Sequence, residues 1–455
     1  MRCGVKFVTP DEIEGAVAAG LPQAVEDLKR LVAIPSVAFP GHPEEPVHAA
    51  AAATEELLRS AGLPHVRQIP VDGSFPAVYA EAPAPPGAPT VLLYAHYDVQ
   101  PAGDPLLWRT PAFEPTEIDG ALYGRGAADD KSGVISHVAA LRVFQGRFPV
   151  GVKIIIEGQE EYAGERLEAF VERNPELLRA DAIIVADTGN PHVDDPAVTT
   201  SLRGMGAFTV EVRTLSESLH SGTFGGAAPD ALAALIRMLA ALHDDNGDIR
   251  VPGLPRGVFL GAGPSEEEFR KGAGVLDGVS LVGSGSLADR LWASYAITVT
   301  GLDVPTVAGA INAVQPVARA RVTVRVPPAA DPRTAVESVV DFLNQVAPWG
   351  VKVSFSDYVA GSGFLADSGG AARTALNDAM ERAYGRPPRD VGTGGSIPLV
   401  STLAKQFPAA SILLFGAEDD DASIHAPNER VDLAELRRNI LAEALFLQRY
   451  GAATA

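Results

Sequence analysis

Cysteine is almost absent from this chain of 455 residues, since Cys3 is the only one. A single cysteine excludes a disulfide within the chain and a zinc site built from several thiolates. Long apolar runs are also lacking, because no stretch of 18 apolar residues is present to span a bilayer. Acidic residues near the N-terminus stand where a signal peptide would be apolar. We therefore expect a cytoplasmic protein without a membrane partner.

Basic residues are in the minority, with 37 Lys and Arg against 57 Asp and Glu and a formal net charge of −20. Such a chain would be repelled by the phosphates of nucleic acids, so we expect no nucleic-acid partner. The hydrophobic content of 46% is typical of a globular protein. The length favours two or three domains over one compact core.

The order of the predicted elements indicates that one domain interrupts another. Helix-like and strand-like patterns alternate at first, which predicts an α/β domain with a mostly parallel sheet. The middle of the chain has the four strands and two helices of a ferredoxin-like α+β module, with a Gly-rich insertion at 245–290 of unassigned role. The α/β pattern then returns. We expect one discontinuous domain at 1–204 and 360–455 and an inserted domain at 205–359.

Polar side chains follow the predicted strands one after another. His96 and Asp98 close one strand, Glu160 and Glu161 follow another, and Asp187 follows a third. In such sheets ligands gather at the carboxyl ends of the strands, so we expect these side chains to lie together. Successive strand residues point to opposite faces, which indicates separate tasks for the two adjacent glutamates.

Two further residues complete a candidate metal-binding set. Asp129 precedes a predicted helix, and His425 lies in an acid-rich loop far downstream. Two histidines and three carboxylates suffice for two divalent ions that share a bridging carboxylate. Taken singly, each has an ordinary alternative, with the histidines as structural or solvent-facing residues and the acids as helix caps, turns or solvated loops. The acidic run at 418–421 lacks EF-hand spacing and is interpreted as a solvated loop.

Short motifs spread over roughly residues 90 to 430 carry a resemblance to a known family. In order they are "HYDVQP", "GRGAADDKSG", "EGQEEYAG", "ADTGN", "SLRG", "LHSGTFGGA", "VRVPP", "GTGGSIP" and "IHAPNE". Together they resemble the M20 metallopeptidase family, most closely its carnosinase-like, non-specific dipeptidase branch. The resemblance implies a homodimer in which the discontinuous domain is catalytic and the inserted domain serves as a lid and dimerisation domain.

The resemblance also implies a dinuclear metal centre. His96, Asp129 and Asp187 would hold one ion, while Asp129, Glu161 and His425 hold the other, so that Asp129 bridges both. This donor set suits Zn²⁺, with Mn²⁺ or Co²⁺ as alternatives.

Two neighbouring carboxylates receive catalytic roles by the same resemblance. Asp98 would accept the other ring N–H of His96 and fix the orientation of that imidazole. Glu160 would be the general base, which takes a proton from the metal-activated water and passes it to the leaving amine.

Substrate contacts are expected partly from the inserted domain. By resemblance His220 reaches a neighbouring subunit's site and stabilises the oxyanion, although it would also serve as a cap of the following turn. Arg325 would clamp the terminal carboxylate of the substrate, unless it is an ordinary surface residue of its strand. Weaker candidates for the same contact are Asn312, Gly394, Gly395 and Ser396.

We expect a metal-dependent hydrolase that cleaves dipeptides or short peptides with a free C-terminal carboxylate. One alternative is an N-acyl-amino-acid amidohydrolase of the same fold, either a deacylase or a carboxypeptidase-like enzyme. The other is a non-catalytic binding protein, which the intact ligand set and general base argue against. The family often carries a charged residue where this chain has Thr393, so the preferred substrate side chains stay open.

Overall fold

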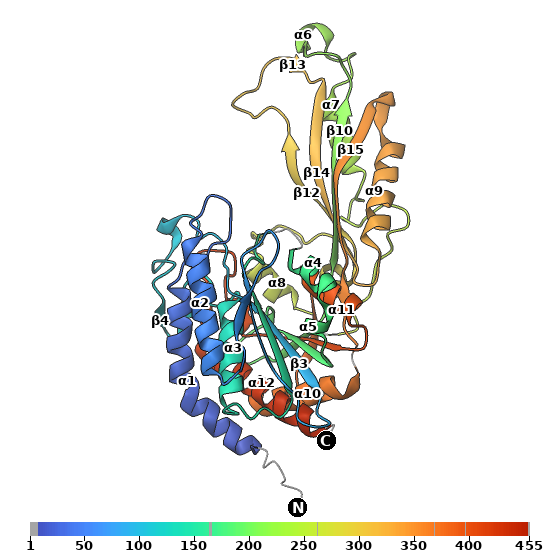
Figure 1. Cartoon of the computed structure of the whole chain (residues 1–455). Helices are drawn as coiled ribbons and strands as arrows, with labels where there is room; N and C mark the ends of the chain where they lie inside the picture. The colour runs from blue at the N-terminus through green and yellow to red at the C-terminus, as the bar shows by residue number, and fades with distance from the viewer. Residues whose placement is uncertain (1–7, 163–165, 262, 368, 396, 454–455) are drawn as a thin grey trace, which may run out of the picture. The chain divides into compact units, whose positions relative to one another are not determined.

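The computed structural model describes residues 8–453 except 163–165, 262, 368 and 396. The chain forms two compact units, one of which is discontinuous in sequence (Figure 1). The first unit comprises residues 1–200, 366–390 and 399–455, and the second comprises 201–365 and 391–398. Among the helices in the described part of the chain, none combines the length and apolar character needed to cross a bilayer.

The first unit is built on a mixed sheet with strand order β1-β2-β6-β3-β7-β18-β9. The pairs β6–β3, β3–β7 and β7–β18 are parallel, whereas β1–β2, β2–β6 and β18–β9 are antiparallel. The sheet is thus parallel at its centre rather than mostly parallel throughout. Its strands are β1 (Arg67–Ile69), β2 (Ala77–Ala82), β3 (Thr90–His96), β6 (Gly151–Glu157), β7 (Ala182–Val185), β9 (Ala197–Leu202) and β18 (Ser411–Leu414).

Helices pack around this sheet and against one another. α3 contacts β3, and α1, α3 and α12 contact each other, while α10 lies along α12. The central strands are buried along nearly their whole length, as parallel strands usually are. The helices are α1 (Pro10–Val32), α2 (Glu45–Ser60), α3 (Lys131–Arg142), α4 (Arg166–Arg173), α5 (Pro175–Leu178), α10 (Gly370–Tyr384), α11 (Pro398–Gln406) and α12 (Leu433–Ala453).

Short strands shape the loops at the carboxyl edge of the sheet. β20 (Arg430–Asp432), β5 (Ala121–Tyr123) and β4 (Thr116–Ile118) form one small sheet. β19 (Glu418–Asp419) and β8 (Gly189–Asn190) form a parallel pair. The short helix η1 (Pro105–Leu107) also lies in this unit, and β17 (Arg389–Thr393) pairs with β9.

The second unit has a four-stranded antiparallel sheet of order β12-β14-β10-β15. In chain order its main elements are β10 (Gly204–Arg213), α7 (Ala231–Ala240), β12 (Ala296–Asp303), β14 (Val317–Val326), α9 (Pro332–Val346) and β15 (Lys352–Gly361). This β-α-β-β-α-β order is that of a ferredoxin-like module. Alternate residues of β14 are buried, and they share a core with α7 and α9.

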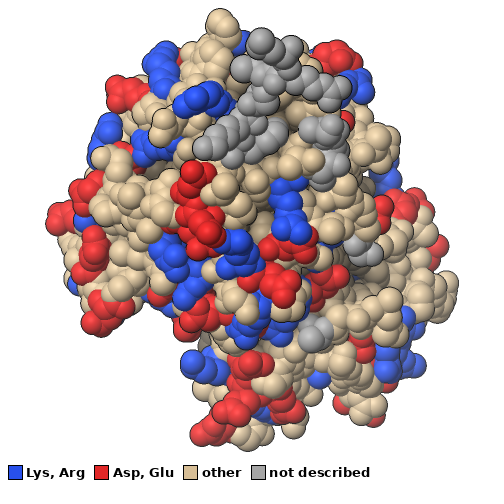
Figure 2. All heavy atoms as spheres, turned by 90° about the horizontal axis from the view of Figure 1, so that it is seen from below, with Lys and Arg blue, Asp and Glu red and all other residues tan. Residues whose placement is uncertain are grey.

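Smaller elements complete the second unit. They are β11 (Leu219–His220), α6 (Ser221–Phe224), α8 (Glu266–Gly272), η2 (Asp289–Ala293), β13 (Ala313–Val314), η3 (Pro348–Gly350) and β16 (Phe364–Leu365). On the face of the molecule drawn in Figure 2, Lys and Arg side chains lie among Asp and Glu side chains. The acidic excess of the chain therefore does not make this face a surface of one sign.

Candidate active site

The parallel centre of the sheet brings the predicted residues to one edge. β3 ends at His96, β6 ends three residues before Glu160, and β7 ends two residues before Asp187. Because these three strands are parallel neighbours, their carboxyl ends meet at the same edge. The side chains that the sequence analysis expected to lie together are indeed close in space.

Asp129 lies between the two histidines. One carboxylate oxygen, Oδ1, is 3.0 Å from Nε2 of His96, and the other, Oδ2, is 2.9 Å from Nε2 of His425. Nε2 of His425 is also 3.1 Å from Oε2 of Glu161. Ligand atoms of Asp129, Glu161 and His425 all lie within 4.8 Å of one another. A carboxylate whose two oxygens face two different imidazoles has the geometry of a bridging ligand.

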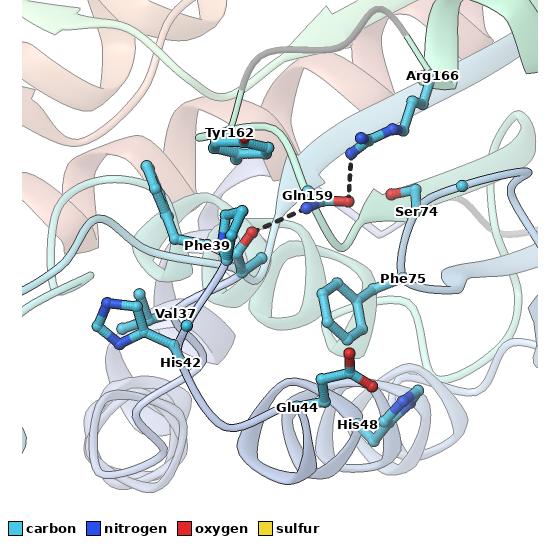
Figure 3. A pocket seen from close by; sticks show the side chains of 14 residues that line it. Val37, Phe39, His42, Glu44, His48, Ser74, Phe75, Gln159, Tyr162 and Arg166 are labelled. Carbon is cyan, nitrogen blue, oxygen red and sulfur yellow. Dashed lines mark hydrogen bonds between the residues drawn. The ribbon is translucent and has the colours of Figure 1, made fainter.

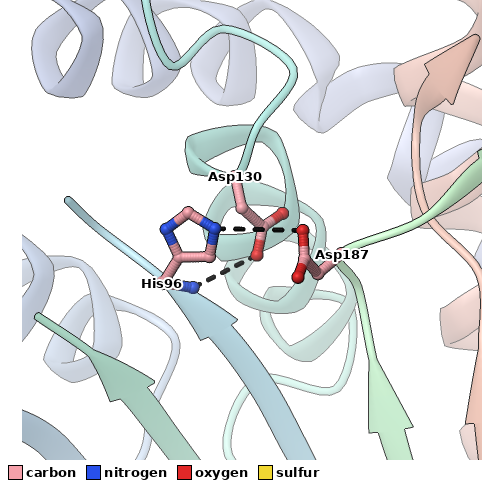
Figure 4. A group of neighbouring side chains, drawn as sticks. All are labelled: His96, Asp130 and Asp187. Carbon is pink, nitrogen blue, oxygen red and sulfur yellow. Dashed lines mark hydrogen bonds and ion pairs between the residues drawn. The ribbon is translucent and has the colours of Figure 1, made fainter. Parts of the chain in front are cut away.

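The second group surrounds His96, as Figure 4 shows. Oδ1 of Asp187 is 3.8 Å from Nε2 of His96, and His96, Asp130 and Asp187 offer ligand atoms within 4.8 Å of one another. Asp130 directly precedes α3, but its side chain makes no capping hydrogen bond to the helix. Its Oδ2 instead accepts the backbone N–H of His96 at 3.1 Å, which holds the end of β3 in place.

Asp98 contacts both the histidine and the glutamate pair. Nδ1 of His96 is 3.1 Å from the backbone carbonyl oxygen of Asp98 and 3.5 Å from its Oδ1. The carboxylate of Asp98 accepts the backbone N–H groups of Glu160 at 3.0 Å and Glu161 at 3.2 Å. Asp98 therefore positions the glutamate pair with its side chain and the imidazole chiefly with its backbone.

The charges of this cluster displace its pKa values strongly. Burial raises the pKa of Glu160 well above its usual range, and the nearby carboxylates of Asp187 and Glu161 add to this against the opposing charge of His96. Burial also acts to raise the pKa of Asp129, but its hydrogen bonds with His425 and His96 outweigh burial and lower it. The carboxylates outnumber the imidazoles, so the cluster carries an excess of negative charge.

The donors fit a pair of divalent cations. Imidazole nitrogens and carboxylate oxygens are the ligands that zinc, cobalt and manganese accept. Oδ1 of Asp130 and Oε1 of Glu418 are buried here without a hydrogen-bond partner among the described residues. Buried polar atoms are normally paired, and a cation would satisfy such oxygens.

Glu429 holds the loop that carries the bridging aspartate. Its Oε1 accepts the backbone N–H groups of Ala128 at 3.0 Å and Asp129 at 3.1 Å. Its Oε2 accepts the N–H of Gly126 at 3.0 Å and Nη1 of Arg125 at 2.6 Å. No role for Glu429 could be predicted from the sequence, because these contacts join segments about 300 residues apart.

Gln100 orients the carboxylate of Glu161. Its backbone N–H donates to Oε1 at 3.2 Å and its side-chain amide donates to Oε2 at 2.8 Å. The Glu161 side chain is only 3% exposed, whereas that of His425 is 53% exposed. The site is therefore open to solvent on the side of His425.

The acidic run at 418–421 is not uniformly a solvated loop, which corrects the sequence-based interpretation. Asp420 and Asp421 are exposed, but Asp419 is 8% exposed and Glu418 is partly buried. Burial and the charges of Asp129 and Asp187 raise the pKa of Glu418 well above its usual range. The first two residues of the run form the short strand β19, which pairs with β8.

A cavity of about 490 Å³ in the first unit is lined in part by the residues that flank the glutamate pair (Figure 3). Gln159 and Tyr162, the residues directly before and after the pair, both line it. The Gln159 amide donates to the carbonyl oxygen of Ala38 at 2.8 Å, and Oε1 of Gln159 accepts from Arg166 at 2.7 Å. Gln159 thus ties the start of this segment to the loop that follows α1.

In the second unit, two arginines lie near each other. Arg325 projects from β14, and burial lowers its pKa. Burial and the charge of Arg325 lower the pKa of Arg203 to about 10. Neither guanidinium has a carboxylate partner among the described residues, and Arg203 donates only to the carbonyl oxygens of Arg290 and Ser294. Arg203 was not among the predicted substrate-binding residues, although it lies in the motif "SLRG".

His220 is exposed at the end of β11 and caps α6. Its Nδ1 accepts the backbone N–H groups of Gly222 at 3.1 Å and Thr223 at 3.3 Å. A neutral ring with an accepting Nδ1 carries its proton on Nε2, which leaves that N–H free to donate. Asn312 lies beside this turn, because its backbone oxygen accepts the N–H of Ser221 at 2.9 Å.

The glycine loop approaches Arg203 closely. A Cβ atom at Gly394 would lie 2.8 Å from Nη2 of Arg203, so a larger residue there would displace the guanidinium. Gly395 donates its N–H to Oγ1 of Thr393 at 3.3 Å. Ser396, the third candidate in this loop, lies outside the described residues.

A histidine–carboxylate cluster at the carboxyl edge of a mixed α/β sheet defines a class of metal-dependent hydrolases. The chain matches the model of peptidase family M20/M25/M40 over residues 92–449. The chain therefore belongs to this peptidase family, which confirms the resemblance found in its motifs.

Two similar proteins are named as dipeptidases. The chain is 41% identical over 401 residues to a cysteinylglycine-S-conjugate dipeptidase of Corynebacterium striatum, covering 87% of this chain and 88% of the relative. It is 29% identical to a Beta-Ala-His dipeptidase of Rattus norvegicus, over 82% of this chain and 79% of the relative.

Solved structures share the fold over nearly the full length. Human carnosine dipeptidase 1 has a TM-score of 0.77 and 25% identity, covering 97% of this chain and 98% of that chain. The dipeptidase Dug1p of Saccharomyces cerevisiae has a TM-score of 0.80 and 22% identity, covering 98% and 99%.

Proposed function

We propose that this chain is a dinuclear metal-dependent dipeptidase that hydrolyses the amide bond of dipeptides or short peptides with a free C-terminal carboxylate. The observation that carries the proposal is the placement of Asp129, whose two oxygens face His96 and His425. A pair of ions held at these residues, next to a glutamate with a raised pKa, would support metal-assisted amide hydrolysis.

His96, Asp129 and Asp187 would hold one ion, and Asp129, Glu161 and His425 the other. When bound, such a pair lowers the pKa of water and polarises the substrate carbonyl. The donor set suits Zn²⁺, with Mn²⁺ and Co²⁺ as alternatives.

Glu160 acts as the general base. It accepts a proton from the attacking water and returns it to the nitrogen of the leaving amine, so that no proton is gained or lost. Burial raises the pKa of Glu160 well above its usual range, and a carboxylate with a raised pKa is a stronger proton acceptor. The hydrogen bond from its backbone N–H to Asp98 fixes its place.

The second unit supplies groups for the substrate. Arg325 and Arg203 together form a cationic pair without a carboxylate partner among the described residues, which suits the terminal carboxylate of a peptide. Nε2–H of His220 is a free donor for the oxyanion of the tetrahedral intermediate. By family resemblance His220 serves a neighbouring subunit's site, so we propose a homodimer in which this unit acts as lid and dimerisation domain.

The relatives suggest which dipeptides to try first. The Corynebacterium striatum relative is named for S-conjugates of cysteinylglycine, and the rat relative for Beta-Ala-His. Both names describe dipeptides with a free amine, which favours a dipeptidase over the alternative N-acyl-amino-acid amidohydrolase.

The test is hydrolysis by protein stripped with a chelator and then restored with Zn²⁺, Mn²⁺ or Co²⁺. The panel holds Cys-Gly, an S-substituted Cys-Gly and Beta-Ala-His, each with its N-acetylated counterpart, and Glu160→Ala is the inactive control. Metal-restored cleavage of the free dipeptides supports the proposal. Cleavage of the acetylated compounds alone would move the function to deacylation, and no turnover with two bound ions would refute the substrate class.

A further inference from the structure

Glu418 is brought to the metal cluster by the pairing of two very short strands. In the parallel pair β19–β8, Glu418 lies opposite Gly189, which is two residues after Asp187. A Cβ atom at Gly189 would lie 2.2 Å from the carbonyl oxygen and 2.4 Å from the Cβ of Glu418. Only glycine allows so close an approach, so this position is built to seat Glu418 beside Asp187.

The two residues of β19 face in opposite directions, as successive strand residues do. The carboxylate of Asp419 turns to Arg430, with Oδ1 3.1 Å from Nη2. Glu418 instead offers an oxygen that lies within 4.8 Å of ligand oxygens of both Asp129 and Asp187.

The charged groups around the carboxylate of Glu418 are mostly acidic. Its Oε1 is shielded from solvent and has no hydrogen-bond partner among the described residues. The charges around it are chiefly those of Asp129, Asp187 and Glu429, with His96 as the opposing group. A buried anion among anions is costly unless a cation completes the group.

We propose that Glu418 is a further ligand of the ion held by His96 and Asp187, in addition to the five residues assigned by family resemblance. The inference rests on the proposed dinuclear site and deepens it. The ion at His96 then has one imidazole and three carboxylates, whereas the ion at His425 has one imidazole and two carboxylates. Carboxylate oxygens suit Mn²⁺ better than imidazole does, so Glu418 favours Mn²⁺ at the His96 position.

The test compares metal binding by Glu418→Gln, by wild type and by a matched control, Asp421→Asn. Asp421 lies three residues along the same loop, and its side chain is 73% exposed. Mn²⁺ binding is measured by equilibrium dialysis with elemental analysis, and spin coupling between the two ions by electron paramagnetic resonance. We expect wild type and Asp421→Asn to bind two coupled ions per chain. Glu418→Gln should bind one of them about 10- to 100-fold more weakly.

The metal preference gives a second readout. Because the lost ligand is a carboxylate, the affinity for Mn²⁺ should fall more than the affinity for Zn²⁺. Without metal, Glu418→Gln should melt at a higher temperature than metal-free wild type, since glutamine carries no charge that the neighbouring carboxylates could repel.

Three outcomes would overturn the inference. If Glu418→Gln binds two Mn²⁺ ions as tightly as wild type does, Glu418 is not a ligand, whereas the proposed dinuclear dipeptidase still stands. A metal-free Glu418→Gln that melts below metal-free wild type points to a structural role for this side chain. If the wild-type protein binds fewer than two ions at saturation, both the proposed function and this inference are wrong.

Discussion

The carboxylate of Asp98 accepts the backbone N–H of Glu160 at 3.0 Å, although 62 residues separate them in sequence. The other oxygen of the same carboxylate accepts the N–H of Glu161 at 3.2 Å. The side chain of Asp98, just beyond the end of β3, therefore holds in place the backbone of both the proposed base and a proposed metal ligand. This contact fixes two glutamates more directly than it fixes His96.

Removing the Asp98 carboxylate should impair both tasks of the glutamate pair. We expect Asp98→Ala to lower metal affinity by about 10- to 100-fold, as is usual for groups that orient ligands. Asp98→Asn keeps one acceptor oxygen and should fall between Ala and wild type. Equilibrium dialysis and kcat/KM for a dipeptide measure this, and equal losses in the two variants would contradict the bonding seen here.

Changing Glu160 or Glu161 to glutamine should have different effects, one on the rate of catalysis and the other on metal binding. Glu160→Gln should lower kcat by about 10²- to 10⁴-fold with two ions still bound, because a general base is lost. Glu161→Gln should weaken the ion at His425, since its Oε2 lies 3.1 Å from that imidazole. Measuring the metal content and the kcat of each variant tests whether the two effects differ in this way. Full metal content in Glu161→Gln and loss in Glu160→Gln would reverse the two roles.

Glu429 should matter for stability as well as for activity. Burial raises its pKa to about 7 against the charge of Arg125, so the ion pair is formed at pH 8. Glu429→Gln should destabilise the fold at pH 8 by about 3–5 kcal/mol, because it leaves a buried guanidinium unpaired. Urea unfolding measures this loss.

The double variant Arg125→Met, Glu429→Gln serves as the control for that measurement. It should recover part of the lost free energy of unfolding, since no uncompensated charge is left. No recovery would mean that the hydrogen bonds to the Asp129 loop, rather than the ion pair, carry the effect.

His137 and Glu443 form a buried pair between α3 and α12, with Nδ1 2.9 Å from the carboxylate. Burial acts to lower the pKa of His137, but the charge of Glu443 and its hydrogen bond outweigh burial and raise it above 6.5. A raised histidine pKa contributes stability that is complete below the unfolded pKa and is lost as pH rises through the folded pKa. Glu443→Gln should therefore cost more free energy of unfolding at pH 6 than at pH 9. Equal costs at both pH values would contradict this pairing.

Arg325 should affect binding of the C-terminal carboxylate of the substrate. We expect Arg325→Met to raise KM for dipeptides with a free carboxylate by about tenfold or more, since a charge-assisted hydrogen bond is worth about 1.5–3 kcal/mol. A C-terminally amidated dipeptide should be cleaved equally by both proteins. A matching rise in KM for the amide would show that Arg325 does not contact the carboxylate.

Local pattern explains why much of this protein is predictable. The apolar run that ends at His96 and the isoleucines before Glu160 specify buried strands, and the pairing of such strands forces their ends together. The donor types at those ends then indicate metal chemistry. The motifs identified the family, which the match over residues 92–449 confirms.

The sequence by itself determined the strands, the polar residues at their ends and the family. Only the tertiary structure decided that the sheet is mixed, because strand direction at its edges depends on pairing partners rather than on residue pattern. The tertiary structure also determined which further residues lie around the histidine–carboxylate cluster. Glu429 reaches Asp129 across 300 residues, and Glu418 reaches Asp187 through a two-residue strand pair. Contacts between segments so distant leave no periodic signal, since they arise only when the chain folds.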